Sequence, residues 1–299
     1  MEIPAELART LATVVAEGTF DAASRALQIT PSAVSQRIKA LEQHLGRVLL
    51  VRQKPVRATE AGQAVVRYAR QLALLEHDAL AGFALGRTDG EVDRRPIAVP
   101  LAVNADTLGT WILPTLAGLA ARYPVVFDLH RDDQDFTAEL LESGTVMAAI
   151  TSQATPVAGC VARPLGVMRY RAVATPEYVA RWLPGGMTPA ALSGAPLVDF
   201  DRRDDLQTGF LRFVGADDAA PPRHYVPASN DFAVAVKLGL GWGMLPGFQS
   251  DEELADGRLV PLGGPPIDVP LHWQQWNLRS PLLDTIADAV VAEARRAFS

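Results

Sequence analysis

The strongest constraint on this 299-residue chain is a pair of short helical patterns near its N-terminus, over 20–27 and 30–42. Thr30 and Pro31 mark where the second helix begins, because a threonine side chain accepts from free amides and a proline at the first helical position forfeits no hydrogen bond. Val34, Ile38 and Leu41 then recur at helical spacing. The pattern predicts two helices joined by a tight turn.

The face opposite this apolar stripe is polar and basic. Ser32, Gln36 and Lys39 point away from the stripe. A helix in the major groove reads base edges with its first turns, where serine and glutamine both donate and accept, while lysine suits phosphate. The pattern therefore favours a DNA-binding helix-turn-helix over the alternative, a helical hairpin with a merely solvated face.

A basic hairpin is predicted directly after the helices. Residues 47–52 have a strand-like pattern, and 53–57 turn around Pro55. Arginine in such a wing favours narrow, strongly negative stretches of the minor groove; the alternative is a solvated basic turn.

Residues 1–57 carry eight basic and five acidic side chains, net +3, whereas the whole chain has −6 and the remainder therefore −9. The candidate DNA-binding residues are Pro31, Ser32, Ser35, Gln36, Arg37, Lys39, Arg52 and Lys54.

The motif order of this region resembles that of the LysR-type transcriptional regulators. The resemblance rests on Ala22-Ala23-Ser24, the run from Pro31 to Ile38, and Thr59-Glu60-Ala61-Gly62. It implies an N-terminal all-α winged helix-turn-helix followed by an α/β effector region of two Rossmann-like lobes, similar to periplasmic binding proteins. The implied limits are 1–58 for the DNA-binding domain, 59–87 for a linker helix, 88–95 for a hinge and 96–299 for the effector domain, with lobe I at about 96–162 and 267–299 and lobe II at about 163–266.

The linker helix is expected to begin near Thr59, whose hydroxyl can cap it. Its apolar residues alternate in steps of four and three, which is the spacing of a helix that packs against a partner helix. We therefore expect a homodimer or homotetramer, the alternative being that the stripe packs only on its own chain. The expected dimerisation residues are Val65, Tyr68, Leu72 and Leu75.

From Pro96 onward, strand patterns alternate with helical ones. Strands at 97–103, 125–129 and 146–151, with helices at about 107–122 and 136–142, predict a mostly parallel sheet. Further strands are expected near 170–174, 197–200, 224–226, 242–245 and 269–273, before a C-terminal helix from about Leu282. About 200 residues exceed the common size of one domain, so two lobes are expected.

Small polar and acidic residues follow several of these strands. Ligands of open α/β sheets bind outside the carboxyl ends of the strands. Helix starts offer amides to an anionic group and carboxylates hold a cation, so a basic amino acid would use both; the alternative is that these residues only cap helices. The candidate effector residues are Asn104, Asp106, Thr107, Thr151, Asp199, Asp201, Ser229 and Asp231.

The effector half resembles one branch of the family, the regulators that sense lysine and arginine and control export of basic amino acids. The resemblance rests on 104–111, 156–160, 239–243 and Trp273-Gln274-Gln275-Trp276. It implies binding of lysine, arginine or histidine without turnover. A different effector, such as an aromatic or organic acid, stays open, and so does a small-molecule-binding α/β enzyme.

Other function classes find little support. The five histidines are far apart and Cys160 is alone, so neither a metal site nor a thiol nucleophile nor a cofactor is expected. No stretch has the length of a membrane span and the N-terminus lacks a signal pattern, which predicts a cytoplasmic protein. The expected partners are double-stranded DNA, a small effector and further copies of the chain; contact with RNA polymerase stays open.

Overall fold

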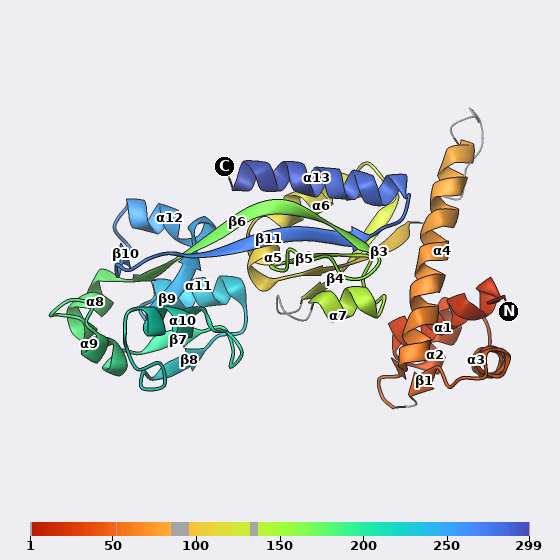
Figure 1. Cartoon of the computed structure of the whole chain (residues 1–299), viewed down its shortest axis with the longest axis horizontal. Helices are drawn as coiled ribbons and strands as arrows, with labels where there is room; N and C mark the ends of the chain where they lie inside the picture. Colours follow the sequence, from red (N-terminus) through yellow and green to blue (C-terminus); the bar gives the residue numbers. More distant parts are fainter. Residues whose placement is uncertain (1, 52, 85–95, 132–136, 299) are drawn as a thin grey trace.

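A computed structural model describes residues 2–51, 53–84, 96–131 and 137–298. The molecule is elongated (Figure 1): the N-terminal helices lie at one end, lobe II lies at the other, and lobe I lies between them. The predicted hinge at 88–95 and the side chain of Arg52 fall outside the described residues. Within the described ranges, no helix is long and apolar enough to cross a membrane.

The N-terminal domain is the predicted winged helix-turn-helix. It contains α1 (Ala5–Glu17), α2 (Phe20–Ala26), α3 (Pro31–Leu45) and the antiparallel wing strands β1 (Leu50–Val51) and β2 (Arg57–Ala58). Thr30 caps α3 by accepting from the amide of Ala33 at 3.2 Å. Val34, Ile38 and Leu41 are buried in the core that α1 shares, which confirms the apolar stripe.

The long helix α4 (Glu60–Ala84) packs on both domains. Thr59 Oγ1 accepts from the amide of Gly62 at 3.1 Å, as the sequence predicts for the start of this helix. Its first turns belong to the N-terminal core, whereas Leu74 is buried in the effector core. Between these regions, the Arg70 guanidinium donates to the carbonyls of Gly144 and Thr145 in lobe I.

Lobe I begins with a parallel arrangement of three strands, as predicted. In this arrangement β3 (Ile97–Val103) lies between β4 (Val125–Arg131) and β5 (Ala148–Thr151). The expected single helix at 107–122 is instead α5 (Ala105–Thr110) and α6 (Ile112–Ala120), because the backbone of Trp111 departs from helical geometry at φ −123°. The short helix α7 (Thr137–Glu142) precedes β5.

Two long antiparallel strands run through both lobes, β6 (Cys160–Ala174) and β11 (Ile267–Trp276). They form one mixed sheet in the order β10-β6-β11-β5-β3-β4, with β9 also paired to β6. The sequence predicted only 170–174 of β6, whose first part also contains Pro164 and Gly166, residue types that weaken strands. The pairing absorbs them with a shift of register between Leu271 and His272.

Lobe II is built on the far ends of β6 and β11. Its strands are β7 (Leu197–Asp199), β8 (Arg223–Tyr225), β9 (Gly243–Pro246) and β10 (Val260–Pro261). Its helices are α8 (Pro176–Trp182), α9 (Pro189–Gly194), α10 (Leu206–Phe213), α11 (Ser229–Lys237) and α12 (Gly247–Ala255). The last helix, α13 (Pro281–Ala297), returns to lobe I (Figure 1) and packs on α6 and β6.

Candidate functional site

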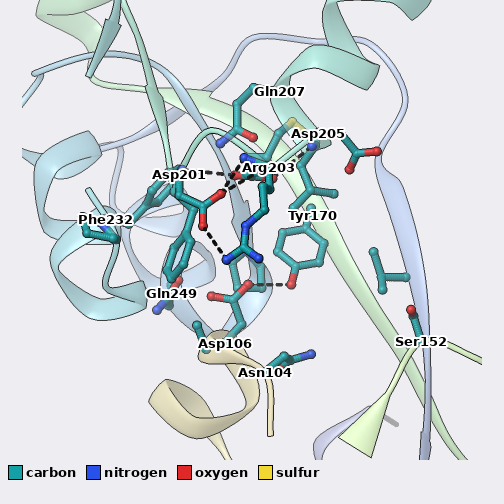
Figure 2. A pocket seen from close by; sticks show the side chains of 18 of the residues that line it. Asn104, Asp106, Ser152, Tyr170, Asp201, Arg203, Asp205, Gln207, Phe232 and Gln249 are labelled. Carbon is teal, nitrogen blue, oxygen red and sulfur yellow. Dashed lines mark hydrogen bonds and ion pairs between the residues drawn. The ribbon is translucent and has the colours of Figure 1, made fainter. Parts of the chain in front are cut away.

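A cleft of about 450 Å³ opens between the two lobes. Figure 2 shows that side chains from lobe I, from β6 and from lobe II converge on it. The polar residues that line it are Asn104, Asp106, Arg131, Ser152, Tyr170, Asp201, Arg203, Asp204, Asp205, Gln207, Gln249 and Asp268.

Asp106 is the centre of a hydrogen-bonded chain across the cleft. Its Oδ2 accepts from the Tyr170 hydroxyl at 2.6 Å, and its Oδ1 accepts from the Ser229 hydroxyl at 2.6 Å. Gln249 Nε2 in turn donates to Ser229 Oγ at 2.9 Å. Burial, followed by the charge of Asp106, raises the pKa of Tyr170 well above its usual value, so its hydroxyl stays a neutral donor.

The loop at 200–206 is held by its own carboxylates. Asp201 Oδ1 accepts from the amides of Arg203 and Asp204 at 2.7 and 3.1 Å. The two oxygens of Asp204 accept from the amides of Phe200 and Leu206, each at 3.1 Å. Burial is the main reason that the pKa of Asp204 rises to about 6. Asp204 therefore holds the loop with both of its carboxylate oxygens, whereas Asp201 uses only Oδ1 for this purpose.

Two buried polar atoms on the cleft wall have no hydrogen-bond partner among the described residues: Asn104 Nδ2 and Gln207 Oε1. Asn104 is 4% exposed and already uses its Oδ1 to cap α5, accepting from the Thr107 amide at 2.7 Å. A buried donor or acceptor without a partner is unfavourable. The pair thus offers a donor suited to a carboxylate and an acceptor suited to an ammonium group.

The cleft has an excess of negative charge. Five aspartates and two arginines line it, and one of the aspartates, Asp268, is engaged by Arg169 in a bidentate pair at 2.7 Å. Arg131 donates to the Pro227 carbonyl at 3.1 Å at the same wall. Charge of this sign attracts a cationic ligand and disfavours an organic acid.

The structure brings part of the predicted effector set to this cleft. Asn104, Asp106 and Asp201 line it, and Ser229 lies one hydrogen bond behind Asp106. Thr107 and Thr151 are buried behind the wall; Thr151 Oγ1 accepts from the Gln153 amide at 3.2 Å.

Asp199 and Asp231 lie away from the cleft, contrary to expectation. Asp199 is the last residue of β7 and pairs with Arg223 of β8, whereas the next residue, Phe200, points to the other side and lines the cleft, as expected from the alternation of side chains along a strand. Asp231 is exposed on α11, two residues beyond Ser229, the helix start that meets Asp106. Neighbouring positions in a strand or helix direct their side chains to different sides. The sequence pattern did not distinguish which of these positions faces the cleft.

Sequence reasoning missed Tyr170, Gln249 and Arg203. Tyr170 lies inside a strand and Gln249 inside a helix, so no strand end marked them. Asp204 and Asp205 are identifiable from the sequence by their proximity to Asp201.

On the N-terminal domain, α3 presents the predicted polar face. Ser32, Gln36 and Lys39 are exposed, and Lys54 is exposed in the wing. Pro31 occupies the first helical position and is exposed, and Ser35 is partly buried. Arg37 departs from expectation, because its guanidinium lies 2.5 Å from Glu6 and is thus paired with α1.

The predicted dimerisation stripe of α4 divides between two environments. Val65 is 4% exposed and Tyr68 is partly buried, and both pack in the core of their own N-terminal domain. Leu72 is partly buried, whereas Leu75 is 42% exposed. The outer part of the stripe is thus the part that a second chain can contact.

A winged helix-turn-helix joined by a long helix to a two-lobed ligand-binding domain defines a one-component transcriptional regulator. Family models agree: "Bacterial regulatory helix-turn-helix protein, lysR family" matches residues 5–63, and "LysR substrate binding domain" matches 99–295. The chain belongs to the LysR-type transcriptional regulators and is not an enzyme.

Similar proteins align along nearly the whole chain. The "HTH-type transcriptional regulator LysG" of Mycobacterium tuberculosis is 44% identical over 284 residues, 95% of this chain and 91% of the relative. The "Lysine export transcriptional regulatory protein LysG" of Corynebacterium efficiens is 44% identical over 96% of both chains. Among solved structures, ArgP from M. tuberculosis has a TM-score of 0.84 at 43% identity, and full-length LysG from Corynebacterium glutamicum "with bound effector Arg" has 0.76 at 38%, each covering 98% of both chains.

Proposed function

We propose that this regulator binds operator DNA through α3 and the wing, takes a basic amino acid into the cleft between the lobes, and controls a gene for amino acid export. The observation that carries the effector class is the position of Asp106 and Asp201, which face one cleft from opposite lobes. A cation held between them contacts both lobes, so its binding favours one arrangement of the lobes over another.

Both ends of such an effector have partners in the cleft. The side-chain cation meets Asp106 and Asp201, and the buried Oε1 of Gln207 accepts from an ammonium group. The buried Nδ2 of Asn104 and the guanidinium of Arg131 suit the α-carboxylate. The acidic lining argues against an aromatic or organic acid, which would need a surplus of arginine.

The relatives support the same class of effector. One solved structure has arginine as its bound effector, and curated relatives are named for lysine export or as ArgP. The high identity over the whole chain makes transfer of this class reasonable, whereas the choice between arginine and lysine depends on details of the cleft.

We further propose that two chains associate through the outer face of α4, where Leu75 is exposed, and place two copies of α3 on adjacent half-sites. The expected domain limits of 1–58, 59–87 and 96–299 fit this division of roles. Operator DNA of a bacterial regulator lies in the cytoplasm, which is the compartment we assign.

Calorimetric titration of the full-length protein with L-arginine, L-lysine, L-histidine and L-glutamate tests the effector class. We expect saturable heat with at least one basic amino acid, none with glutamate, and a loss of at least about tenfold in affinity for Asp106→Asn. Asp231→Asn is the matched control, because it removes the same charge from an exposed position outside the cleft. Binding of glutamate alone, or equal losses in both variants, would contradict the proposal.

A further inference from the structure

The effector cleft contains a cation of its own, the guanidinium of Arg203. Its Nη2 lies 3.7 Å from Asp201 Oδ2. Figure 2 shows the side chain pointing from the 200–206 loop into the cleft, toward Asp106 and beside Asp201. An arginine side chain thus stands where an arginine ligand would place the same chemical group.

The hydrogen bonds of Asp201 determine which of its oxygens a ligand cation can reach. Asp201 Oδ1 already accepts from two backbone amides of the loop, so Oδ2 is the oxygen that remains for a ligand cation. Arg203 pairs with that oxygen. The side chain of Arg203 is 60% exposed, and exposed ion pairs are individually weak, so the pair with Asp201 opposes a ligand cation only modestly.

We propose that Arg203 is a tethered competitor of the effector: its guanidinium occupies the cation position at Asp201, and a basic amino acid must displace it to bind. This inference rests on the proposed function, because it presupposes a basic effector. A group on a short tether has an effective concentration of about millimolar. The competition therefore reduces the fraction of binding-competent protein and raises the effector concentration at which the regulator responds.

The neighbouring arginine supplies a matched control. Arg202 lies on the same loop and carries the same charge, but its guanidinium stacks on the Tyr225 ring at 4.8 Å and it does not line the cleft. Arg203→Gln and Arg202→Gln thus change the charge of the protein equally, and only the first removes the competitor. Arg203→Lys retains a tethered cation and reports on the role of the charge itself.

The test is calorimetric titration of the full-length wild type and the three variants with L-arginine and with L-lysine. We expect Arg203→Gln to lower the Kd by about three- to tenfold, Arg202→Gln to stay within about twofold of wild type because of salt screening, and Arg203→Lys to resemble wild type. Binding by Arg203→Gln when wild type binds too weakly to measure would also support the competitor.

The outcomes separate the inference from the function on which it rests. Weaker binding by Arg203→Gln would show that Arg203 holds the effector carboxylate and would overturn the inference, while the basic effector would stand. Equal tightening by both glutamine variants, or no change in either, would overturn it in the same way. Absence of binding by all four proteins would overturn the proposed effector class together with the inference.

Discussion

The Ser229 hydroxyl donates a 2.6 Å hydrogen bond to Asp106 Oδ1, and this bond joins α11 of lobe II to α5 of lobe I. The approach is close because residue 109 is glycine: a Cβ there would lie 3.1 Å from Ser229 Oγ. The carboxylate proposed to bind the effector therefore also connects the lobes, in addition to strands β6 and β11 and the hydrogen bond from Arg131 to the Pro227 carbonyl. Binding of a ligand and one contact between the lobes therefore involve the same carboxylate.

Gly62→Ala is expected to destabilise the N-terminal domain. A Cβ at this position of α4 would lie 2.0 Å from the Leu49 carbonyl oxygen, and backbone cannot yield as a flexible side chain does. We expect a loss of about 1–3 kcal/mol in the free energy of unfolding, measured by urea titration. Gly118→Ala on α6 is the control, because a Cβ there would have no neighbouring atom within 4 Å and alanine suits a helix better. Equal effects of the two substitutions would contradict the close approach.

Asp204 gives a pH dependence of stability with a definite sign. Its pKa rises from an ordinary 3.8 to about 6 in the folded chain. Between about pH 4 and pH 6 the folded state therefore holds a proton that the unfolded state lacks, and the free energy of unfolding falls as the pH rises, by about 3 kcal/mol at most. Above about pH 6 the contribution is constant.

Denaturant titrations from pH 4 to pH 7 measure this effect. Asp204→Asn should flatten the decline relative to wild type, since the difference between the two proteins cancels other titrating groups. Asp205→Asn, an exposed neighbour, should retain it. Identical slopes in wild type and Asp204→Asn would rule out Asp204 as the source.

On α3, Gln36→Ala and Lys39→Ala are expected to change DNA binding in different ways. Gln36 lies where base edges are read, so its loss should weaken specific binding more than non-specific binding. Lys39 suits phosphate, so its loss should weaken both and reduce the salt slope by about one. Fluorescence anisotropy with operator and scrambled duplexes over a range of salt concentrations distinguishes them; equal loss of specificity would refute the assignment.

Arg70→Ala is expected to uncouple the effector from DNA binding. The substitution leaves the carbonyls of Gly144 and Thr145 without their donor from α4. The Kd for the effector should stay near wild type, whereas the effector-dependent change in DNA affinity should shrink by about threefold or more. Arg163→Ala removes the same charge from the surface of lobe I, where Arg163 pairs with Asp288, and should keep the coupling. Full coupling in Arg70→Ala would contradict this role for the contact.

Leu75→Asp tests the proposed association through α4. Leu75 is 42% exposed, and a charge there should oppose the packing of a partner helix. Sedimentation velocity should show a smaller assembly than wild type. Leu240→Asp in lobe II has a similar exposure of 45% and should leave the assembly unchanged. An unaltered sedimentation coefficient for Leu75→Asp would place the interface elsewhere.

The sequence predicted best where local chemistry decides the structure. Thr30 and Thr59 cap the helices that they were expected to cap, and Ile97–Val103 forms the expected strand. Asn104, Asp106 and Asp201 reach the cleft because residues that closely follow a strand emerge at the sheet edge.

Prediction failed where a distant segment decides the outcome. Arg37 pairs with Glu6 because α1 lies within its reach, and Val65 is buried because α4 packs on its own N-terminal domain. The first ten residues of β6 were missed because their partner strand is about 100 positions away in the sequence. None of these contacts leaves a periodic signal in the neighbouring residues.

The 25 residues of α4 join the DNA-binding domain to lobe I through a single continuous helix. At 1.5 Å per residue this helix is about 37 Å long. Since Val65 and Val66 fix it in one core and Leu74 fixes it in the other, the helix acts as a lever arm. The start of the helix at Glu60 lies about 21 Å from Leu74, so a rotation of lobe I by about 10° about Leu74 would displace that start by about 4 Å, close to one base-pair step of about 3.4 Å along the duplex. A small rotation of lobe I on ligand binding would thus be amplified along the helix into a larger displacement of the DNA-binding domain.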